Sequence, residues 1–523
     1  MQSDRELRMK YPIGIQDFEK IRKEGYLYID KTSFIYQMVN GGSYYFLSRP
    51  RRFGKSLLVS TLEAYFKGKK ELFEGLAMQR LEKEWKVYPV LHLDLNSEDY
   101  KTAESLYAIL NNQLVIWEQK YGSAQSETTV ASRFMGIIRR ACEKSGLRVV
   151  VLVDEYDKPL LQTLGNEDLQ TEYRNTLKAF YGALKSCDRY IQFALLTGVT
   201  KFGRVSVFSD LNNLEDLSMD RRYVELCGIS ENEVHQYLDD AIDLLAAQVG
   251  KSKEECLLNL KQRYDGYHFS SNSIGMFNPF SVLNTLKKQQ FGDYWFETGT
   301  PTFLVELLKK SHYILENLTR EHVTSDVINS IDSLSDNPVP ILYQSGYLTI
   351  KGYDERFRKY HLGFPNQEVE QGFVNFLAPY YTGMKPTKSA FYVENFVSDI
   401  ENGDAEGFMK RLEAMFADNS YQIAGDEELY FQNAVYIIFK MLGFYVDVER
   451  PTSDGRIDVL IRTPQYIYIF ELKVNQSADV ALQQIEEKQY AAPFALEQRR
   501  LFKIGVNFST KTRKISEWKI ERK

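Results

Sequence analysis

The sequence has few cysteines and no long apolar run. Its four cysteines, Cys142, Cys187, Cys227 and Cys256, lie far apart, and none has a CxxC partner or a histidine at metal-ligand spacing. This pattern argues against a disulfide framework and a zinc site, so we interpret all four as core thiols. No apolar run reaches the roughly 18 residues of a membrane span. The charged start MQSDRELRMK also lacks the apolar segment of a secretion signal. We therefore expect a protein of the reducing cytoplasm without a membrane partner.

The chain also lacks an overall positive charge. Its formal net charge is −6, which excludes a polycation that coats nucleic acid by electrostatics alone. Any contact with nucleic acid must therefore be local. The segment 498–523 offers one place, because it holds nine Lys or Arg residues against two acidic ones, Glu517 and Glu521. It is either a solvated basic segment or a phosphate-binding surface, and the sequence leaves both open.

Extensive disorder is a further class that the composition excludes. Aromatic residues make up 14% of the chain, with 35 Tyr and 32 Phe, whereas disordered segments are poor in them. With 523 residues and 44% hydrophobic content, the chain is too long for one core and can build two or three. A multidomain globular protein follows, and the sequence leaves a homo-oligomer open.

The first part of the chain alternates apolar strands with helical segments. Continuous apolar strands separated by helices indicate a parallel sheet covered on both faces, so the fold class is α/β. We expect strands at 43–48, 90–95, 149–153 and 191–196, and a helix at 55–66.

The pattern becomes mainly helical near residue 230. Ser230 and Glu233 form a capping box ahead of an apolar-periodic run, which predicts the start of a helix. We therefore place a first domain at 1–229 and a mainly helical lid or accessory region at 230–398.

The last part of the chain, 399–523, is expected to be a separate α/β domain. Its order is helix, three strands, helix and strand. Turn residues at 453–455 and 464–465 favour a meander of the three strands. The helices are expected at 427–441 and 478–490, and the strands at 444–449, 456–461, 466–472 and 501–508.

A phosphate-binding loop is indicated where the first strand meets the helix at 55–66. A P-loop needs backbone N–H groups around the phosphates at a helix N-terminus, a lysine for the β- and γ-phosphates and a hydroxyl on Mg²⁺. Gly54, Lys55 and Ser56 supply the last half of this pattern. We therefore expect ATP and Mg²⁺ as cofactors.

The first half of the loop departs from the usual GxxxxGK[ST] pattern. Arg49 replaces the first glycine, and Pro50 lacks an N–H group. Arg52 and Phe53 stand directly before Gly54, and we count both among the nucleotide-binding residues.

A second nucleotide motif follows about 100 residues later. The strand at 149–153 ends in Asp154 and Glu155, of which the first would hold the Mg²⁺ shell and the second would polarise the attacking water. A strand-end turn is the alternative. After the next strand, Thr197 could sense the γ-phosphate and Arg204 could act as an arginine finger. A helix cap and a surface charge remain equal alternatives for these two residues.

Several segments resemble bacterial AAA-ATPase-like proteins, which often end in a PD-(D/E)XK nuclease domain. The resemblance spans nearly the whole chain, and the Arg49-Pro50 departure agrees with the family's own loop pattern. It implies a P-loop ATPase domain followed by a restriction-endonuclease-like α/β domain. We interpret the three aromatic segments at 264–269, 294–299 and 362–367 as packing at turns. The matching segments are YIDKT (28–32), FLSRPRRFGKS (46–56), DEYDKP (154–159), FSDLNN (208–213), YDGYHF (264–269), YWFETG (294–299) and LGFPNQ (362–367).

Residues for metal-dependent phosphodiester hydrolysis occur in the last domain. Asp458 begins one strand, and Glu471 and Lys473 end the next. Two carboxylates can share Mg²⁺ while a lysine positions the attacking water. Because side chains alternate along a strand, Glu471 and Lys473 lie on one face. The family pattern also places an acidic residue on the preceding helix, where Glu428 is the candidate metal ligand. Gln484 and Tyr490 resemble the Gln and Tyr that accompany this motif in some relatives.

The leading hypothesis is an enzyme in which ATP binding and hydrolysis control a Mg²⁺-dependent nuclease. The nucleic acid would bind through the last domain, with DNA favoured over RNA. One alternative is a nucleotide-switched module that binds nucleic acid with little or no catalysis. Another is an ATPase whose nuclease-like domain is a structural remnant. The complete sets of polar residues in both motifs favour the enzyme.

Overall fold

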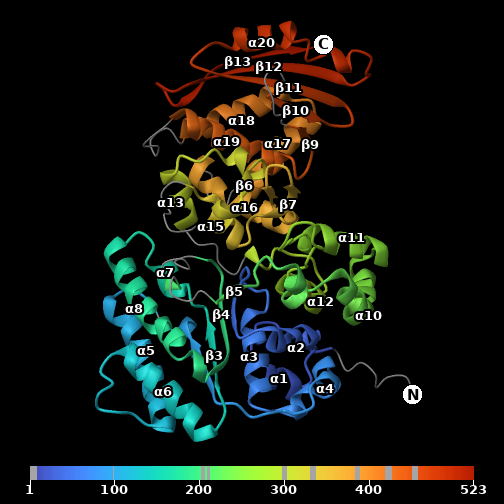
Figure 1. The fold of residues 1–523 in the computed structure, drawn as a ribbon. Coiled ribbons are helices and arrows are strands. Elements are labelled where there is room, and N and C mark those ends of the chain that lie inside the picture. Colours follow the sequence, from blue (N-terminus) through green and yellow to red (C-terminus); the bar gives the residue numbers. More distant parts are fainter. Residues whose placement is uncertain are drawn as a thin grey trace, which may run out of the picture. The chain divides into compact units, whose positions relative to one another are not determined.

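The computed structural model shows a mixed α/β protein made of two compact units (Figure 1). The first comprises Met1–Gly299 and Thr319–Val369, and the second comprises Thr300–Leu318 and Glu370–Lys523. The limits at 229 and 398 expected from the sequence stay predictions. The structure describes residues 9–97, 99–201, 207–208, 213–296, 303–329, 337–382, 389–418, 427–449 and 458–522.

A five-stranded parallel sheet forms the centre of the first unit, as the apolar strands predict. Its strand order is β2-β3-β4-β1-β5. Every residue of β1 and β3 is buried, because helices cover both faces of the sheet. The predicted strands match the observed ones to within a residue or two. The strands are β1 (Tyr44–Ser48), β2 (Val90–Asp94), β3 (Val149–Asp154), β4 (Ile191–Gly198) and β5 (Glu215–Asp216).

The register of the sheet brings three motif-bearing strand ends together. Ser48 at the end of β1 pairs with Gly198 at the end of β4. Val153, one residue before the end of β3, pairs with Leu196 of β4. After β1 the chain crosses to β2 on one side of the sheet, whereas after β4 it crosses to β5 on the other side. The strand order therefore reverses between β1 and β4, and α/β sheets bind ligands at the carboxyl ends of strands where such a reversal occurs.

Helices pack on both faces of this sheet (Figure 1). Helix α3 packs on β3 from one side, and α6 packs on β3 with α5 and α8 outside it. The helix predicted at 55–66 is confirmed at those limits. The helices are α1 (Phe18–Lys23), α2 (Thr32–Gly41), α3 (Lys55–Phe66), α4 (Ala77–Leu81), α5 (Ala103–Tyr121), α6 (Val130–Ser145), α7 (Lys158–Gln162) and α8 (Glu167–Ser186).

Further helices and a small sheet complete the first unit. The predicted capping box of Ser230 and Glu233 starts α10. Helices α10, α11 and α12 share one apolar core, which includes the buried Tyr264. The small antiparallel sheet has the order β6-β8-β7. These elements are α10 (Glu231–Val249), α11 (Lys253–Tyr264), α12 (Pro279–Lys288), β6 (His322–Thr324), α14 (Ser325–Asn329), α15 (Val339–Gln344), β7 (Thr349–Asp354) and β8 (Lys359–Gly363).

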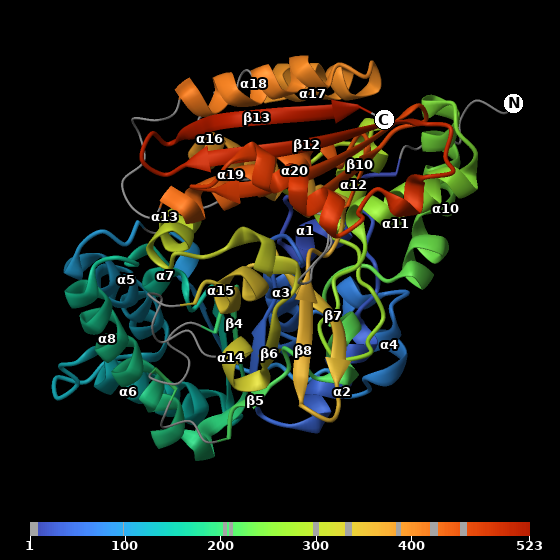
Figure 2. The ribbon, with the colours of Figure 1, turned by 90° about the horizontal axis from the view of Figure 1, so that it is seen from above.

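A five-stranded mixed sheet of order β13-β12-β11-β10-β9 forms the centre of the second unit (Figure 2). Among the strand pairs described in this sheet, β11 and β12 run parallel and the others run antiparallel. Helix α20 covers one face, and α17, α18 and α19 cover the other (Figure 1). The elements are α13 (Phe303–Lys310), α16 (Gln367–Thr382), α17 (Ser389–Glu401), α18 (Ala405–Asp418), α19 (Glu427–Leu442), β9 (Asp447–Glu449), β10 (Val459–Arg462), β11 (Tyr466–Val474), α20 (Ala478–Glu487), β12 (Arg500–Ser509) and β13 (Lys514–Arg522).

The second unit differs from the sequence-based expectation in several places, one of which is β10: it begins at Val459, so Asp458 lies directly before the strand. Strand β9 starts three residues later than predicted, because the N–H groups of Tyr445 and Val446 still bond to Leu442 at the end of α19. Helix α20 ends at Glu487, and the left-handed backbone of Gln489 then turns the chain. Strand β13 was not predicted, because its mostly polar residues give no apolar run. The turn expected at 453–455 lies outside the described residues.

Candidate functional sites: a phosphate loop and a carboxylate pair

The loop between β1 and α3 has the backbone of a phosphate loop. Arg52 and Gly54 both adopt left-handed backbone angles, with φ of 67° and 92°. Glycine adopts this conformation without strain, and Gly54 is the N-cap of α3. These turns curl the loop around the N-terminus of α3, where free N–H groups and the helix dipole favour an anion.

Lys55 lies inside this curl. Its side chain is only 4% exposed, and its Nζ donates hydrogen bonds to the carbonyl oxygens of Arg49 (3.1 Å) and Pro50 (3.3 Å). The same Nζ lies 3.7 Å from Glu155 Oε1 at the end of β3. The structure therefore brings together the lysine and the second carboxylate of the two predicted motifs.

The two carboxylates after β3 have different environments. Asp154 Oδ1 accepts hydrogen bonds from Thr197 Oγ1 at 2.6 Å and from the Glu155 N–H at 3.1 Å. Both bonds end on Oδ1, so among the described residues Oδ2 carries no hydrogen bond, and a carboxylate oxygen of this kind suits Mg²⁺. Burial raises the pKa of Glu155, and the nearby Lys55 opposes this shift. A base near neutral pH is favoured by a pKa raised in this way.

Asp157 is a third carboxylate that the sequence did not single out as functional. It is fully buried and accepts hydrogen bonds from the Val199 N–H (3.2 Å) and from the N–H (2.6 Å) and hydroxyl (2.7 Å) of Thr200. A Cβ on Gly198 would lie 2.4 Å from Asp157 Oδ1. Asp157 thus fixes the turn after Thr197. The available signal was a third carboxylate in DEYDKP, three residues after Asp154.

Arg49 stands where other P-loops have their first glycine. Its guanidinium is buried and donates to the carbonyl oxygens of Ser48 (3.0 Å), Ser218 (2.7 Å) and Tyr223 (3.2 Å). It also lies over the Phe269 ring, 4.1 Å from the centroid. Burial lowers the pKa of this group, but the carbonyl oxygens and the ring face still solvate the cation. Arg49 therefore clamps the start of the loop.

The remaining predicted loop residues take different positions. Phe53 is buried edge-on against Tyr267 and Phe269, so its ring packs the loop and only its backbone can face a phosphate. Arg52 is exposed and lies over the Phe280 ring. Ser56 is half-buried in the first turn of α3. Arg204 lies outside the described residues.

A cavity of about 100 Å³ opens beside Gly54. Its lining is mostly apolar and includes Tyr28 and Ile29 from the YIDKT segment, together with Gly228 and Ile229 before α10. The YIDKT segment is held in place by Lys31, whose Nζ donates to Glu233 at 2.5 Å. The cavity is smaller than the roughly 300–1,000 Å³ of a complete small-molecule site, so it can hold only part of a ligand.

In the second unit, the structure brings Asp458, Glu471 and Lys473 together. Asp458 Oδ2 accepts a 2.7 Å hydrogen bond from the Leu472 N–H, which ties it to β11. Lys473 Nζ donates to Glu471 Oε1 (2.8 Å) and to Gln484 Oε1 of α20 (2.6 Å). Glu471 and Lys473 thus share the α20 face of the sheet, as strand alternation predicts. Gln484 in turn donates to the Tyr490 hydroxyl at 3.5 Å.

Glu471 has the environment of a metal ligand. Its side chain is 1% exposed, and its Oε2 has no hydrogen-bond partner among the residues that the structure describes. Burial raises the pKa of this carboxyl, with a further rise from Asp458 opposed by Lys473. A buried, unpartnered carboxylate oxygen beside a second carboxylate fits a hard divalent cation.

Glu428 is not joined to this pair in the structure. It is exposed on the first turn of α19. In the ranges that the structure describes, no three His, Cys, Asp or Glu side chains are grouped closely enough to hold one metal ion. Asp458 and Glu471 therefore form a pair of carboxylates rather than a triad.

The basic segment at the end of the chain is largely part of the second sheet. In its described part, the basic residues include four that pair with acidic side chains. Lys511 and Lys514 lie exposed at the β12–β13 turn. The four pairs are Arg499 with Glu497, Lys503 with Glu486, Lys519 with Asp479 and Arg522 with Glu406.

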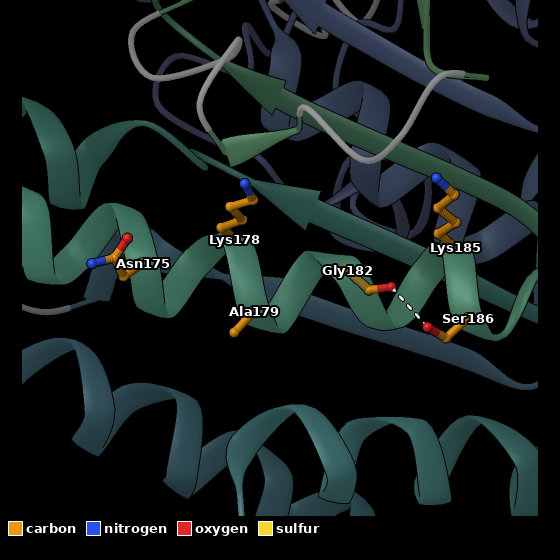
Figure 3. A pocket seen from close by; sticks show the side chains of 6 residues that line it. All are labelled: Asn175, Lys178, Ala179, Gly182, Lys185 and Ser186. Carbon is orange, nitrogen blue, oxygen red and sulfur yellow. Dashed lines mark hydrogen bonds between the residues drawn. The ribbon is translucent and has the colours of Figure 1, made fainter.

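A shallow depression of about 490 Å³ lies along α8, away from both motifs (Figure 3). Lys178 and Lys185 project toward the same side, and Asn175, Ala179, Gly182 and Ser186 complete the lining. None of these residues belongs to a predicted motif, and none of the described lining residues carries a carboxylate, so we do not count the depression as a catalytic site. Among the described helices, none combines the length and the apolar character that a bilayer crossing requires.

Comparison with known proteins agrees with both sites. Residues 12–208 match the AAA-ATPase-like family, described as a predicted AAA-ATPase, and residues 426–518 match the PD-(D/E)XK nuclease superfamily. An uncharacterized protein in the vnfD 5′ region of Azotobacter chroococcum mcd 1 is 35% identical, over 98% of this chain and 99% of that protein. The chain therefore belongs to the family of predicted AAA-ATPases, and it carries a PD-(D/E)XK nuclease superfamily domain at its C-terminal end.

Proposed function

We propose that the first unit binds and hydrolyses ATP and that its nucleotide state controls a nuclease in the second unit. The observation that carries this proposal is the approach of Lys55 Nζ to Glu155 Oε1, 3.7 Å apart where the loop and β3 meet. Lys55 would contact the β- and γ-phosphates, and Glu155 would orient the attacking water. Its raised pKa favours acceptance of a proton from that water.

Ser56 Oγ and Asp154 would hold Mg²⁺ at this site. Mg²⁺ held there would neutralise negative charge that develops on the phosphates during transfer. Thr197 would fix the rotation of Asp154 through its 2.6 Å hydrogen bond. Arg204 remains the proposed arginine finger. The base would occupy the apolar cavity beside Gly54, next to Tyr28 and Ile29.

In the second unit, Asp458 and Glu471 would hold Mg²⁺ through their carboxylates, with Glu428 as a proposed supplement. The bound cation would make water a stronger nucleophile and stabilise the phosphate charge. Lys473, held by Gln484 at 2.6 Å, would position the water for attack. The substrate would be nucleic acid, because the family and the carboxylate pair support phosphodiester cleavage. We propose DNA over RNA as this nucleic acid. The proposed site of action is the cytoplasm, and a homo-oligomer stays open.

The full-length chain tests this function in two assays. One measures ATP binding and hydrolysis, and the other measures plasmid cleavage with and without ATP and Mg²⁺. Lys55→Ala should abolish ATP binding because it removes the charge nearest the phosphates. Glu155→Gln should bind ATP but hydrolyse it at least about a hundredfold more slowly.

The two variants also separate the rival hypotheses. If wild type and Glu155→Gln bind ATP equally and neither hydrolyses it, the nucleotide-switched binding module is the better account. If the wild-type chain binds plasmid without cutting it, the second unit is better described as a nucleic-acid-binding domain without catalysis. A Lys55→Ala variant that binds ATP as tightly as wild type contradicts the phosphate-loop assignment.

A further inference from the structure

An aromatic residue far along the chain contacts the phosphate loop. Trp295, from the YWFETG segment, donates a 3.1 Å hydrogen bond from its indole Nε1 to the carbonyl oxygen of Arg51. The indole is buried, and its ring lies edge-on to Tyr347 at 5.4 Å between centroids. Trp295 thus reaches a backbone group in the middle of the loop.

Trp295 is itself held by a buried carboxyl group. Its backbone N–H donates a 2.7 Å hydrogen bond to Glu368 Oε1, and Glu368 Oε2 accepts a 2.7 Å bond from Ser281 Oγ on α12. Glu368 is 1% exposed and directly follows the LGFPNQ segment. The YWFETG segment and the residue after the LGFPNQ segment are therefore joined by hydrogen bonds that run from Ser281 through Glu368 and Trp295 to the loop.

The bond to Arg51 has a consequence for the next amide. In a trans peptide, the carbonyl oxygen and the following N–H point in opposite directions from one rigid plane. Holding the Arg51 carbonyl toward Trp295 therefore directs the Arg52 N–H the other way. Arg52 also has a φ of 67°, which is costly for a residue with a Cβ. Without an anchor, the loop would lower its free energy by leaving this conformation.

We propose that Trp295, held by Glu368, is a positioning residue that fixes the Arg52 amide of the phosphate loop for a nucleotide phosphate. This inference rests on the nucleotide binding proposed above. It makes the middle of the chain part of the nucleotide site, because the anchor comes from residues 281–368.

Trp295→Phe in the full-length chain tests the anchor. Phenylalanine keeps an aromatic ring but removes the N–H donor, so the affinity for ATP and ADP, measured by calorimetry, should fall about tenfold. Trp117→Phe is the matched control, because Trp117 is also 6% exposed and ring-packed, in α5 against Phe134. This control should bind both nucleotides like wild type.

A second pair of variants tests the hold on Trp295. Glu368→Gln keeps an acceptor oxygen for the Trp295 N–H and should keep affinity within about twofold, whereas Glu368→Ala should lose several-fold. If Trp295→Phe does not fold, the two Glu368 variants test the inference instead. Equal ATP affinity of Glu368→Gln and Glu368→Ala then overturns it. Trp295→Phe that binds ATP as tightly as Trp117→Phe also overturns it, while the proposed function stands. A wild-type chain that binds no nucleotide overturns both.

Discussion

Thr197 Oγ1 donates a 2.6 Å hydrogen bond to Asp154 Oδ1. The two residues lie at the ends of neighbouring parallel strands, β4 and β3. A carboxylate that accepts such a bond on one oxygen is fixed in rotation, so Thr197 sets how Asp154 is presented to a cation. The bond places Thr197 next to a proposed Mg²⁺ ligand, and its expected role as a γ-phosphate sensor stays a prediction.

Thr197→Val should slow ATP hydrolysis by about tenfold or more and leave ATP affinity within a few-fold of wild type. Valine has nearly the same shape but cannot donate, and hydrogen bonds to carboxylates are worth roughly 1.5–3 kcal/mol. Steady-state hydrolysis and calorimetry give the two numbers. Thr197→Ser keeps the hydroxyl and is the control. Equal hydrolysis by the Val and Ser variants would show that the bond has no role in turnover.

Asp458→Asn and Lys473→Ala should fail to cleave nucleic acid for different reasons. Asp458→Asn replaces a charged ligand by a neutral amide, so Mg²⁺ affinity and cleavage should both fall, cleavage by orders of magnitude. Lys473→Ala should keep or raise Mg²⁺ affinity, because it removes a cation 2.8 Å from Glu471 Oε1, and should still lose cleavage. Metal titration and plasmid cleavage separate these effects.

ATP hydrolysis is the internal control for this pair. It should persist in both variants, since the phosphate loop belongs to the other unit. If the wild-type chain cuts and both variants cut equally well, the carboxylate assignment is wrong. The second unit would then be a binding domain.

Glu368 predicts a pH dependence of stability. Burial raises the pKa of this carboxyl from its usual 4.5 to about 8. Because the folded state holds the proton more tightly, the stabilisation is fully present below pH 4.5 and is lost as the pH rises toward 8. Between pH 5 and 8, wild type should therefore lose on the order of 3–5 kcal/mol relative to Glu368→Gln.

Urea unfolding of both proteins across this range measures the difference. The comparison with Glu368→Gln cancels the contributions of other buried carboxyls, such as Asp157 and Asp265, whose pKa values are also raised by burial. Parallel stability curves for the two proteins would contradict a protonated Glu368 in the folded state.

The exposed lysines at the β12–β13 turn should contribute to nucleic-acid affinity. Lys511→Ala with Lys514→Ala should weaken binding of the full-length chain and reduce the salt slope of log affinity by about 1.5, because each phosphate contact releases counterions. Fluorescence anisotropy with labelled DNA at several salt concentrations measures the slope. Lys503→Ala is the control, since Lys503 already pairs with Glu486. An unchanged slope in the double variant would place the contacts elsewhere.

The local elements of both domains could be predicted from the sequence. Strand β3 is a nearly continuous β-branched run, and α3 begins at Lys55 directly after the N-cap Gly54, so both were placed to within a residue. Alternation along β11 also placed Glu471 and Lys473 on one face. These features depend on neighbours in the chain, whose periodicity and turn preferences act locally. Strand β13 escaped prediction because its polar residues are ordered by pairing with β12, which is a long-range interaction.

What the sequence by itself determined was the identity of the two motifs, because phosphate and metal chemistry require particular side chains at particular spacings. The tertiary structure alone decided how those motifs are supported. Arg49 clamps the loop start on Phe269, and Trp295 anchors its middle. These contacts join residues more than 200 positions apart. Such contacts depend on how distant elements pack against each other, and a local sequence pattern does not determine that packing.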